Sequence, residues 1–240
     1  MNRIIGFDRR LQLNWLDATV GLCQESLDAS VVADHLRQKL EREIAGVEAR
    51  RKTITVLLRI WANVSIEDKH LRDEALQLVT KVSLEDRLWL HWGMSLLAYP
   101  FFRDVAATVG QLSRLQGLFS QAQVQRRMIE NWGQRTTLQR ATQRLLRTFV
   151  DWSVLQDTDV RGSYSIASPR QTENRALALW FLNCALQTNE TEQIPLREFG
   201  QLSYTYPFDL LSFVNDVRLS ERFEVTHQGL DLEMVASSVT

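Results

Sequence analysis

The side chains best suited to chemistry in this sequence are arginines between Gln121 and Val150, where six arginines accompany one acidic residue, Glu130. Arginine keeps its charge, and its planar fork of donors fits phosphate oxygens and guanine edges. An ordinary solvated helix instead mixes basic and acidic side chains three or four residues apart. The shortage of acids therefore favours contact with a polyanion, although a GC-rich genome would enrich arginine without any functional reason.

Three of these six arginines fall on one helix, predicted from Thr136 or Thr137 to about Trp152. At 100° per residue, its apolar residues share a narrow arc that we expect to pack inward: Leu138, Ala141, Leu145, Phe149 and Trp152. The opposite face is polar and basic: Thr136, Gln143, Arg140, Arg144 and Arg147. A solvated amphipathic helix shows the same division, so the prediction depends on the sign of the charges rather than on the division itself.

The elements that position this helix follow one another in a regular order. A helix begins at Pro100 and ends before Gly117, and a short apolar step, residues 118–119, follows it. Ser120 and Gln123 have the spacing of a capping box, which opens a further helix that breaks at residues 131–133. After the arginine-bearing helix, two short β-like runs flank a polar turn at residues 157–162, which predicts a hairpin.

This order of helix, short strand, helix, tight turn, helix and hairpin resembles a winged helix-turn-helix domain over roughly residues 102–167. In that motif the second helix lies in the major groove with its N-terminal residues nearest the base edges. The resemblance makes Gln139, Arg140 and Gln143 candidate base readers. The full set of candidate DNA-binding residues is Arg126, Arg127, Arg135, Thr136, Gln139, Arg140, Gln143, Arg144, Arg147 and Arg161. The prediction requires these arginines to remain accessible, not covered by carboxylates of the chain's own tail.

The remainder of the chain predicts a mainly α-helical protein in three parts. Residues 1–99 form an N-terminal helical domain with 14 basic and 14 acidic side chains, and its core includes Trp15, Trp61, Trp89 and Trp92. Residues 100–168 form the winged module, with 9 arginines against 5 acids. Residues 169–240 form an acidic C-terminal segment, with 5 arginines against 10 acids.

The C-terminal segment is predicted to hold two helices and one short strand. The helices span residues 176–186 and 207–217, and the strand spans residues 222–226. A helix followed by a strand could be a degenerate second winged module, but the sequence contains no internal repeat.

Signals of catalysis are poor. The glycines form no G-x-G, Gly-Lys or G-x-S-x-G motif, which excludes phosphate-binding loops, dinucleotide fingerprints and nucleophile elbows of known pattern. Four isolated histidines and two distant cysteines offer no zinc spacing and no disulfide scaffold. The longest uncharged stretch, residues 88–102, is too short to cross a bilayer. We therefore expect a cytoplasmic protein that is not an enzyme and that uses no metal or cofactor.

Four segments carry a resemblance across the whole chain: LLRIW (57–61), YPFF (99–102), NWGQRTT (131–137) and RFEVTHQGLDLEMV (222–235). Together they resemble BrxA-type accessory proteins of BREX phage-defence systems. The resemblance implies a non-catalytic DNA-binding component that works beside a methyltransferase and an ATPase. That family offers no catalytic motif to transfer onto these residues.

The expected function is therefore binding of double-stranded DNA, with other defence-system proteins as possible partners. One alternative is a protein-interaction adaptor that uses the winged fold and the acidic C-terminal segment within a larger assembly. The other is a transcriptional regulator, which would require a palindromic target and a dimer.

Overall fold

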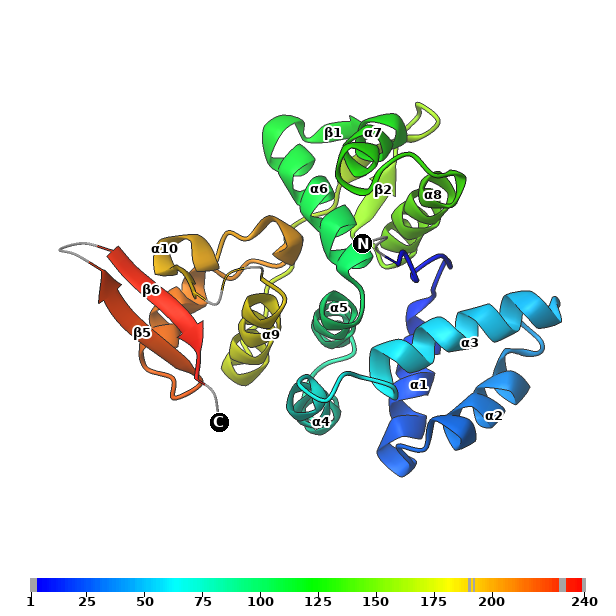
Figure 1. Ribbon diagram of the computed structural model, residues 1–240, viewed down its shortest axis with the longest axis horizontal. Coiled ribbons are helices and arrows are strands. Elements are labelled where there is room, and N and C mark those ends of the chain that lie inside the picture. Colours follow the sequence, from blue (N-terminus) through cyan, green and yellow to red (C-terminus); the bar gives the residue numbers. More distant parts are fainter. Residues whose placement is uncertain (1–3, 190, 192, 229–231, 239–240) are drawn as a thin grey trace.

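The structure is a computed structural model that describes residues 4–189, 191, 193–228 and 232–238. Within these residues the protein is mainly helical, with eleven α-helices and two small sheets of three strands each (Figure 1). This confirms the predicted mainly α-helical class. No described helix combines the length and the apolar character that crossing a membrane requires.

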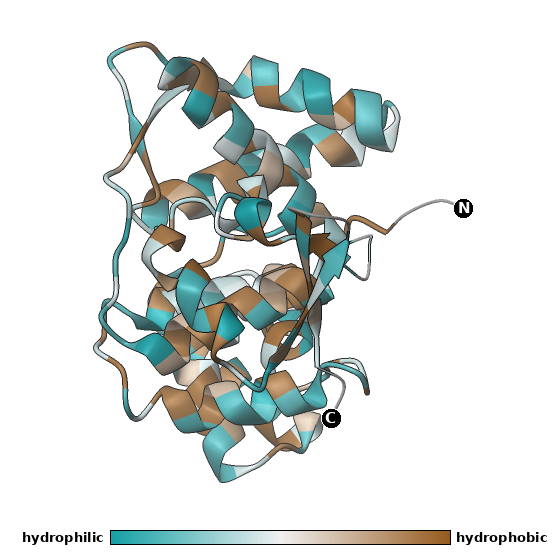
Figure 2. Ribbon diagram, turned by 90° about the vertical axis from the view of Figure 1, so that its left-hand side faces the viewer, coloured by the Kyte–Doolittle hydropathy of each residue, from teal (hydrophilic) through white to brown (hydrophobic). Residues whose placement is uncertain are grey.

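The N-terminal part consists of an extended arm, residues 4–12, and five helices. The helices are α1 (Leu13–Glu25), α2 (Ala29–Leu40), α3 (Val47–Trp61), α4 (Lys69–Leu78) and α5 (Arg87–Ala98). Helices α1 to α4 each bury one side, whereas α5 is buried all round from Leu88 to Leu96. Figure 2 shows hydrophilic and hydrophobic residues alternating along helices of the molecule. This alternation is expected for helices that bury one stripe against a common core.

The central part begins with α6 (Pro100–Gln116), which has the predicted proline in its first turn. It continues through β1 (Leu118–Ser120), α7 (Gln121–Trp132), α8 (Thr136–Asp151), β2 (Leu155–Asp157) and β3 (Ser163–Ile166). The strands form an antiparallel sheet in the order β1-β3-β2, with Phe119 opposite Tyr164 and Leu155 opposite Ile166. The predicted helices and hairpin are present within one or two residues of their expected bounds.

The C-terminal part contains more strands than predicted. Its elements are α9 (Arg175–Gln187), β4 (Gln193–Pro195), α10 (Leu196–Phe199), α11 (Val214–Arg218), β5 (Phe223–Gln228) and β6 (Leu232–Ser237). The prediction of one strand is wrong, because β4 and β6 join β5 in a sheet of order β4-β6-β5. The single helix predicted from Pro207 is also wrong: a 3-10 turn at Leu211–Phe213 leads into the five-residue α11.

The C-terminal part also repeats the topology of the central part. Both run helix, strand, two helices and two strands, and in both sheets the third strand lies between the first and the second. The repeat concerns the order and pairing of the elements, not their lengths, since α10 and α11 have four and five residues against twelve and sixteen in α7 and α8.

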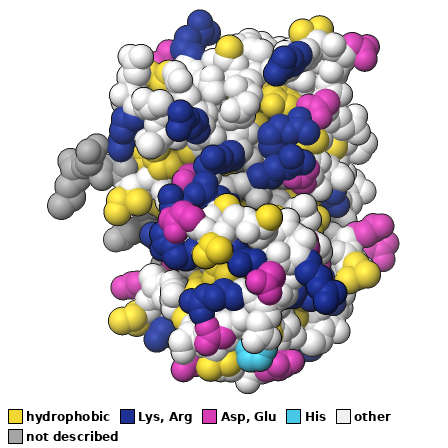
Figure 3. Space-filling model, turned by 90° about the vertical axis from the view of Figure 1, so that its right-hand side faces the viewer, with side chains coloured by type: hydrophobic (Ala, Val, Ile, Leu, Met, Phe, Trp, Pro, Cys, Tyr) yellow, Lys and Arg dark blue, Asp and Glu magenta, His cyan; other side chains and the backbone are white. Residues whose placement is uncertain are grey.

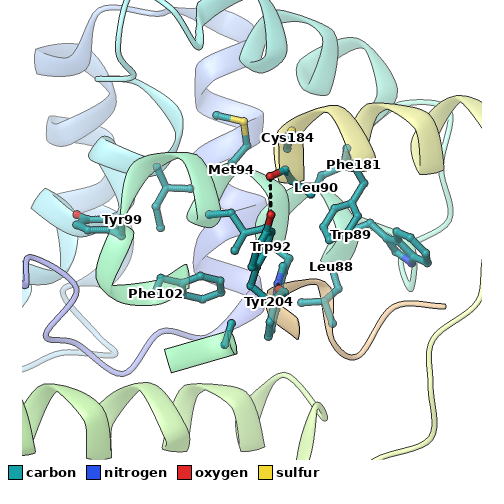
Figure 4. Packing of buried hydrophobic residues seen from close by; sticks show 14 of the residues in the cluster. Leu88, Trp89, Leu90, Trp92, Met94, Tyr99, Phe102, Phe181, Cys184 and Tyr204 are labelled. Atoms are coloured by element: carbon teal, nitrogen blue, oxygen red, sulfur yellow. Dashed lines mark hydrogen bonds between the residues drawn. The ribbon is translucent and has the colours of Figure 1, made fainter. Parts of the chain in front are cut away.

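One hydrophobic core runs through all three parts, and Trp92 of α5 lies in it fully buried (Figure 4). Its ring packs against Phe149 of α8, with centroids 4.8 Å apart, and against Phe102 of α6, at 4.9 Å. Its Nε1 donates a hydrogen bond to the carbonyl of Tyr204, 3.0 Å away. Trp15, Trp61 and Trp89 are buried as well, which confirms the predicted core tryptophans.

The N-terminal arm lies against α8. Phe7 is buried, with its ring centroid 5.3 Å from that of Tyr99 and 5.5 Å from that of Phe102. The backbone of Leu11 donates a hydrogen bond to Thr148 Oγ1 and accepts one from Trp152 Nε1, each 3.0 Å long. These contacts hold the arm along one edge of α8.

Candidate nucleic-acid interface

Local sequence signals determine where α7 and α8, which carry most of the candidate residues, begin and end. Ser120 Oγ accepts a hydrogen bond from the backbone N–H of Gln123, and Gln123 Oε1 accepts one from the backbone N–H of Ser120. This is the predicted capping box at the start of α7. Gly133 ends α7 with φ +77°, a left-handed conformation that glycine adopts without strain. The short connection 133–135 then turns the chain into α8.

The inner and outer faces of α8 are as predicted from the sequence. Leu138, Ala141, Leu145 and Phe149 are buried at 1% exposure or less. The outer face of α8 consists of Thr136, Gln139, Arg140, Gln143, Arg144 and Arg147, of which only Arg147 is half-buried and the others are exposed. The first turn of α8 contains no acidic residue. The structure therefore presents base-reading types of side chain, Gln and Arg, on one accessible helix face.

Arg140 occupies the outer face of α8 without an internal partner. Among the residues that the structure describes, its guanidinium makes no hydrogen bond or ion pair and is open to solvent. An arginine without an internal partner can donate two hydrogen bonds to guanine in the major groove, and the amides of the neighbouring Gln139 and Gln143 can pair with adenine.

Arg147 is bound to a carboxylate of the hairpin. Its Nη1 lies 2.5 Å from Asp157 Oδ1 and 2.8 Å from Asp157 Oδ2. The hydrogen bond to Asp157 raises the pKa of Arg147, so the guanidinium stays protonated. The pair ties α8 to the end of β2, and Asp157 is half-exposed, so solvent reaches this contact.

Arg144 contacts the N-terminal arm. Its Nη1 donates a hydrogen bond to the backbone carbonyl of Asp8, 2.7 Å away, and lies 3.8 Å from Asp8 Oδ2. A second link follows at the end of α8, where Arg10 donates two hydrogen bonds to Asp151, 2.5 and 2.6 Å long. The arm therefore borders the outer face of α8 on the side of Arg144.

The remaining candidate arginines lie on α7, at the start of α8 and on the hairpin. Arg126 is exposed, whereas Arg127 is half-buried and donates to Gln111 Oε1 at 3.4 Å. Arg135, just before α8, donates to the backbone carbonyl of Trp132 at 2.9 Å. Arg161 is exposed in the turn between β2 and β3.

The accessibility of the arginines was the condition for the DNA prediction. The ion pairs that the structure describes for Arg144 and Arg147 involve Asp8 and Asp157, not carboxylates of residues 169–240. Sequence reasoning missed both carboxylates as partners. Asp8 is 136 residues from Arg144 in sequence, and no local pattern links them. Asp157 follows Arg147 by ten residues, and only the return of the chain along β2 brings the two together.

Outside this surface, the described part of the chain offers few side chains arranged for metal binding or catalysis. No group of three or more His, Cys, Asp or Glu side chains lies close enough to hold a metal ion there. Both cysteines are buried, and burial raises the pKa of the Cys23 thiol to about 11. His91 is buried with its Nε2 3.2 Å from Asp17 Oδ1, as expected for a core histidine.

Figure 3 shows that Lys and Arg side chains gather over the upper and central parts of the face that includes α8 and α3.

Comparison with known proteins adds no assignment to this surface: the chain matches no protein-family model, no curated protein and no solved structure.

Proposed function

We propose that this protein binds double-stranded DNA without catalysing a reaction on it. In this proposal residues 100–168 are a winged helix-turn-helix module, α8 is its recognition helix, and the β2–β3 hairpin is its wing. The order of elements and the strand order β1-β3-β2 support this arrangement. The observation that carries the proposal is the outer face of α8, which combines exposed Gln and Arg side chains and has an acid-free first turn.

The candidate residues divide between two roles in this proposal. Gln139, Arg140 and Gln143 read base edges, because amide and guanidinium groups can form two hydrogen bonds to adenine and guanine respectively. The other candidates contact phosphates and sugars, which position the duplex without reading sequence: Arg126, Arg127, Arg135, Thr136, Arg144, Arg147 and Arg161.

DNA binding would exchange partners at two of these arginines. A phosphate carries a full negative charge and suits the arginine fork as well as a carboxylate does. Arg144 and Arg147 are partly exposed where they meet Asp8 and Asp157, so either side chain can turn to a phosphate without unfolding the module. Exposed ion pairs are worth only about 0–1 kcal/mol, so the exchange costs little.

The resemblance of four segments to BrxA-type proteins supports a biological setting for this activity. We place the protein among the accessory components of a bacterial phage-defence system, with proteins of that system as partners. One of the four segments, residues 131–137, forms the α7–α8 connection and the first residues of α8, next to the proposed base readers.

The test is a fluorescence anisotropy titration with random-sequence duplex DNA at about 50 and about 200 mM salt. The wild-type protein is expected to bind and to lose affinity steeply with salt. The triple variant Arg140→Ala, Arg144→Ala and Arg147→Ala is expected to bind about a hundredfold more weakly at low salt, because it lacks two phosphate contacts and one cationic base reader.

The matched control removes three exposed arginines of the C-terminal part, Arg175→Ala, Arg197→Ala and Arg218→Ala. It is expected to bind DNA as the wild-type protein does. Wild-type affinity in the first triple variant would overturn the proposal. Absence of DNA binding together with a stable co-purifying protein would favour an adaptor, and protection of one palindromic sequence would favour a transcriptional regulator.

A further inference from the structure

A groove of about 600 Å³ lies between the start of α8 and the helix α3 of the N-terminal part. Arg135 and Thr137 form the wall on the α8 side. Arg51, Lys52, Thr55 and Val56 form the wall on the α3 side. Between the two walls the arm contributes Ile4, Ile5, Gly6 and Asp8, whose carboxylate lies 3.8 Å from Arg144. The groove is therefore continuous with the end of α8 that would point toward the bases.

The α3 wall carries a net positive charge. Arg51 and Lys52 are exposed, with 61% and 46% of their side-chain surfaces accessible. Both meet one carboxylate, Glu48: Arg51 donates two hydrogen bonds to it, and Lys52 Nζ lies 3.6 Å away. The hydrogen bonds from Arg51 lower the pKa of Glu48 to about 2, so the group of three is one negative and two positive charges.

These cations lie on the same face of the molecule as α8. Figure 3 shows basic side chains continuing from the upper part of that face into its centre, and Figure 1 shows α3 on the same side of the protein as α8 and the arm. A basic surface that extends over both α8 and α3 attracts the phosphates of a longer stretch of duplex than α8 alone would contact.

We propose that a duplex bound to α8 continues across this groove, and that α3 contacts its phosphate backbone through Arg51 and Lys52. The inference rests on the proposed DNA binding by α8. A helix that enters the major groove, which is about 12 Å wide, has a phosphate backbone on each side of it. In this arrangement the basic side chains of the hairpin and of α7 contact one segment of the phosphate backbone. Those of α3 contact the segment that extends past the N-terminal end of α8.

The net positive charge of Arg51, Lys52 and Glu48 makes α3 a backbone-contacting element rather than a reader of sequence. Lysine and arginine contacts to phosphates are sequence-independent. Removing one cation that binds a phosphate is expected to reduce the slope of log affinity against log salt by about 0.9.

The test compares three double variants by anisotropy on a random duplex of about 30 base pairs, roughly three helical turns. Arg51→Ala with Lys52→Ala is expected to bind about tenfold more weakly at low salt and to reduce the salt slope by about 1.8. Arg51→Lys with Lys52→Arg keeps both charges and is expected to retain most of the wild-type affinity.

The matched control is Arg37→Ala with Lys39→Ala on α2, where Arg37 pairs with Asp34 as Arg51 pairs with Glu48. The control removes the same charge from the same part of the chain but outside the groove, and it is expected to bind as the wild-type protein does. An equal loss of affinity in this control would overturn the proposal that Arg51 and Lys52 of α3 contact the duplex directly.

Failure of this inference and failure of the proposed function give different results. If the α3 variant binds as the wild-type protein does while the triple variant of α8 no longer binds DNA, the contact by α3 is wrong and the role of α8 stands. If the triple variant of α8 keeps wild-type affinity, both proposals are wrong.

Discussion

Arg147 and Asp157 form a two-hydrogen-bond ion pair that joins the outer face of α8 to the end of β2. The pair places a carboxylate within a surface that we propose to bind phosphates. Such a carboxylate competes with phosphate for the guanidinium and also repels the DNA backbone. In the proposed complex we therefore expect Asp157 to limit the affinity for DNA, while in the free protein it holds Arg147 in place.

Replacing Asp157 by asparagine should raise the affinity for duplex DNA several-fold at low salt. The change removes one negative charge and leaves the guanidinium of Arg147 to the phosphate. Because the pair is partly exposed, its loss should cost at most about 1 kcal/mol of folding stability. Anisotropy titration and thermal denaturation measure the two effects. Weaker DNA binding by Asp157→Asn would show that the carboxylate instead positions Arg147 for its contact.

Trp92 should be the most sensitive single position for stability. Its ring contacts Phe102 and Phe149 of the central part and Phe208 of the C-terminal part, so it joins all three predicted segments. Trp92→Ala is expected to lower the free energy of unfolding by about 3–5 kcal/mol. Chemical denaturation followed by circular dichroism measures this change.

The same experiment examines the predicted division into residues 1–99, 100–168 and 169–240. Because the hydrophobic core is continuous, we expect a single unfolding transition in the wild-type protein and in Trp92→Ala. Two separated transitions would show that the segments unfold independently and that the contacts of Trp92 do not couple them.

His91 should make folding stability depend on pH. Burial lowers the pKa of His91 below its ordinary value of 6.5, although the hydrogen bond with Asp17 acts in the opposite direction. The unfolded chain therefore binds a proton that the native chain does not, once the pH falls below about 6.5. Stability is complete above this pH and is lost as the pH falls, by up to about 1.4 kcal/mol per pH unit.

The check is the free energy of unfolding measured at several values between pH 7.5 and about 5.5. His91→Gln is expected to flatten the pH dependence in this range, whereas the exposed His35→Gln should keep the wild-type slope. An unchanged slope in His91→Gln would assign the pH dependence to other groups.

Local sequence patterns were sufficient for the central part of the fold. The apolar period of α8, the Ser120–Gln123 capping box and the break at Gly133 are each determined by residues a few positions apart. These sequence patterns predict the structure correctly because the contacts that they specify join residues close together in the sequence. The exposed character of Gln139, Arg140 and Gln143 followed from the same period.

Long-range pairing was not predictable from this sequence. The contact of Arg144 with Asp8 depends on the arm lying along one edge of α8, where the buried side chains of Phe7 and Leu11 hold it. The second sheet was missed because β4 is three residues long and follows a polar segment, so it has no measurable alternation. The repeated topology of the two sheets likewise leaves no repeat in the sequence, since the paired helices differ in length by more than two turns.

The measurement that tests the central claim most directly is thiol crosslinking between α8 and DNA. Both native cysteines are buried, so Gln143→Cys introduces the one accessible thiol of the described chain. We predict a disulfide adduct with a duplex whose base carries a tether ending in a mixed disulfide, from which the introduced thiolate displaces a small thiol. Excess unmodified duplex and high salt should both suppress this adduct. Leu219→Cys, 78% exposed at that position in the C-terminal part, should form little adduct. Equal adduct at positions 143 and 219, or none at position 143, would contradict the account.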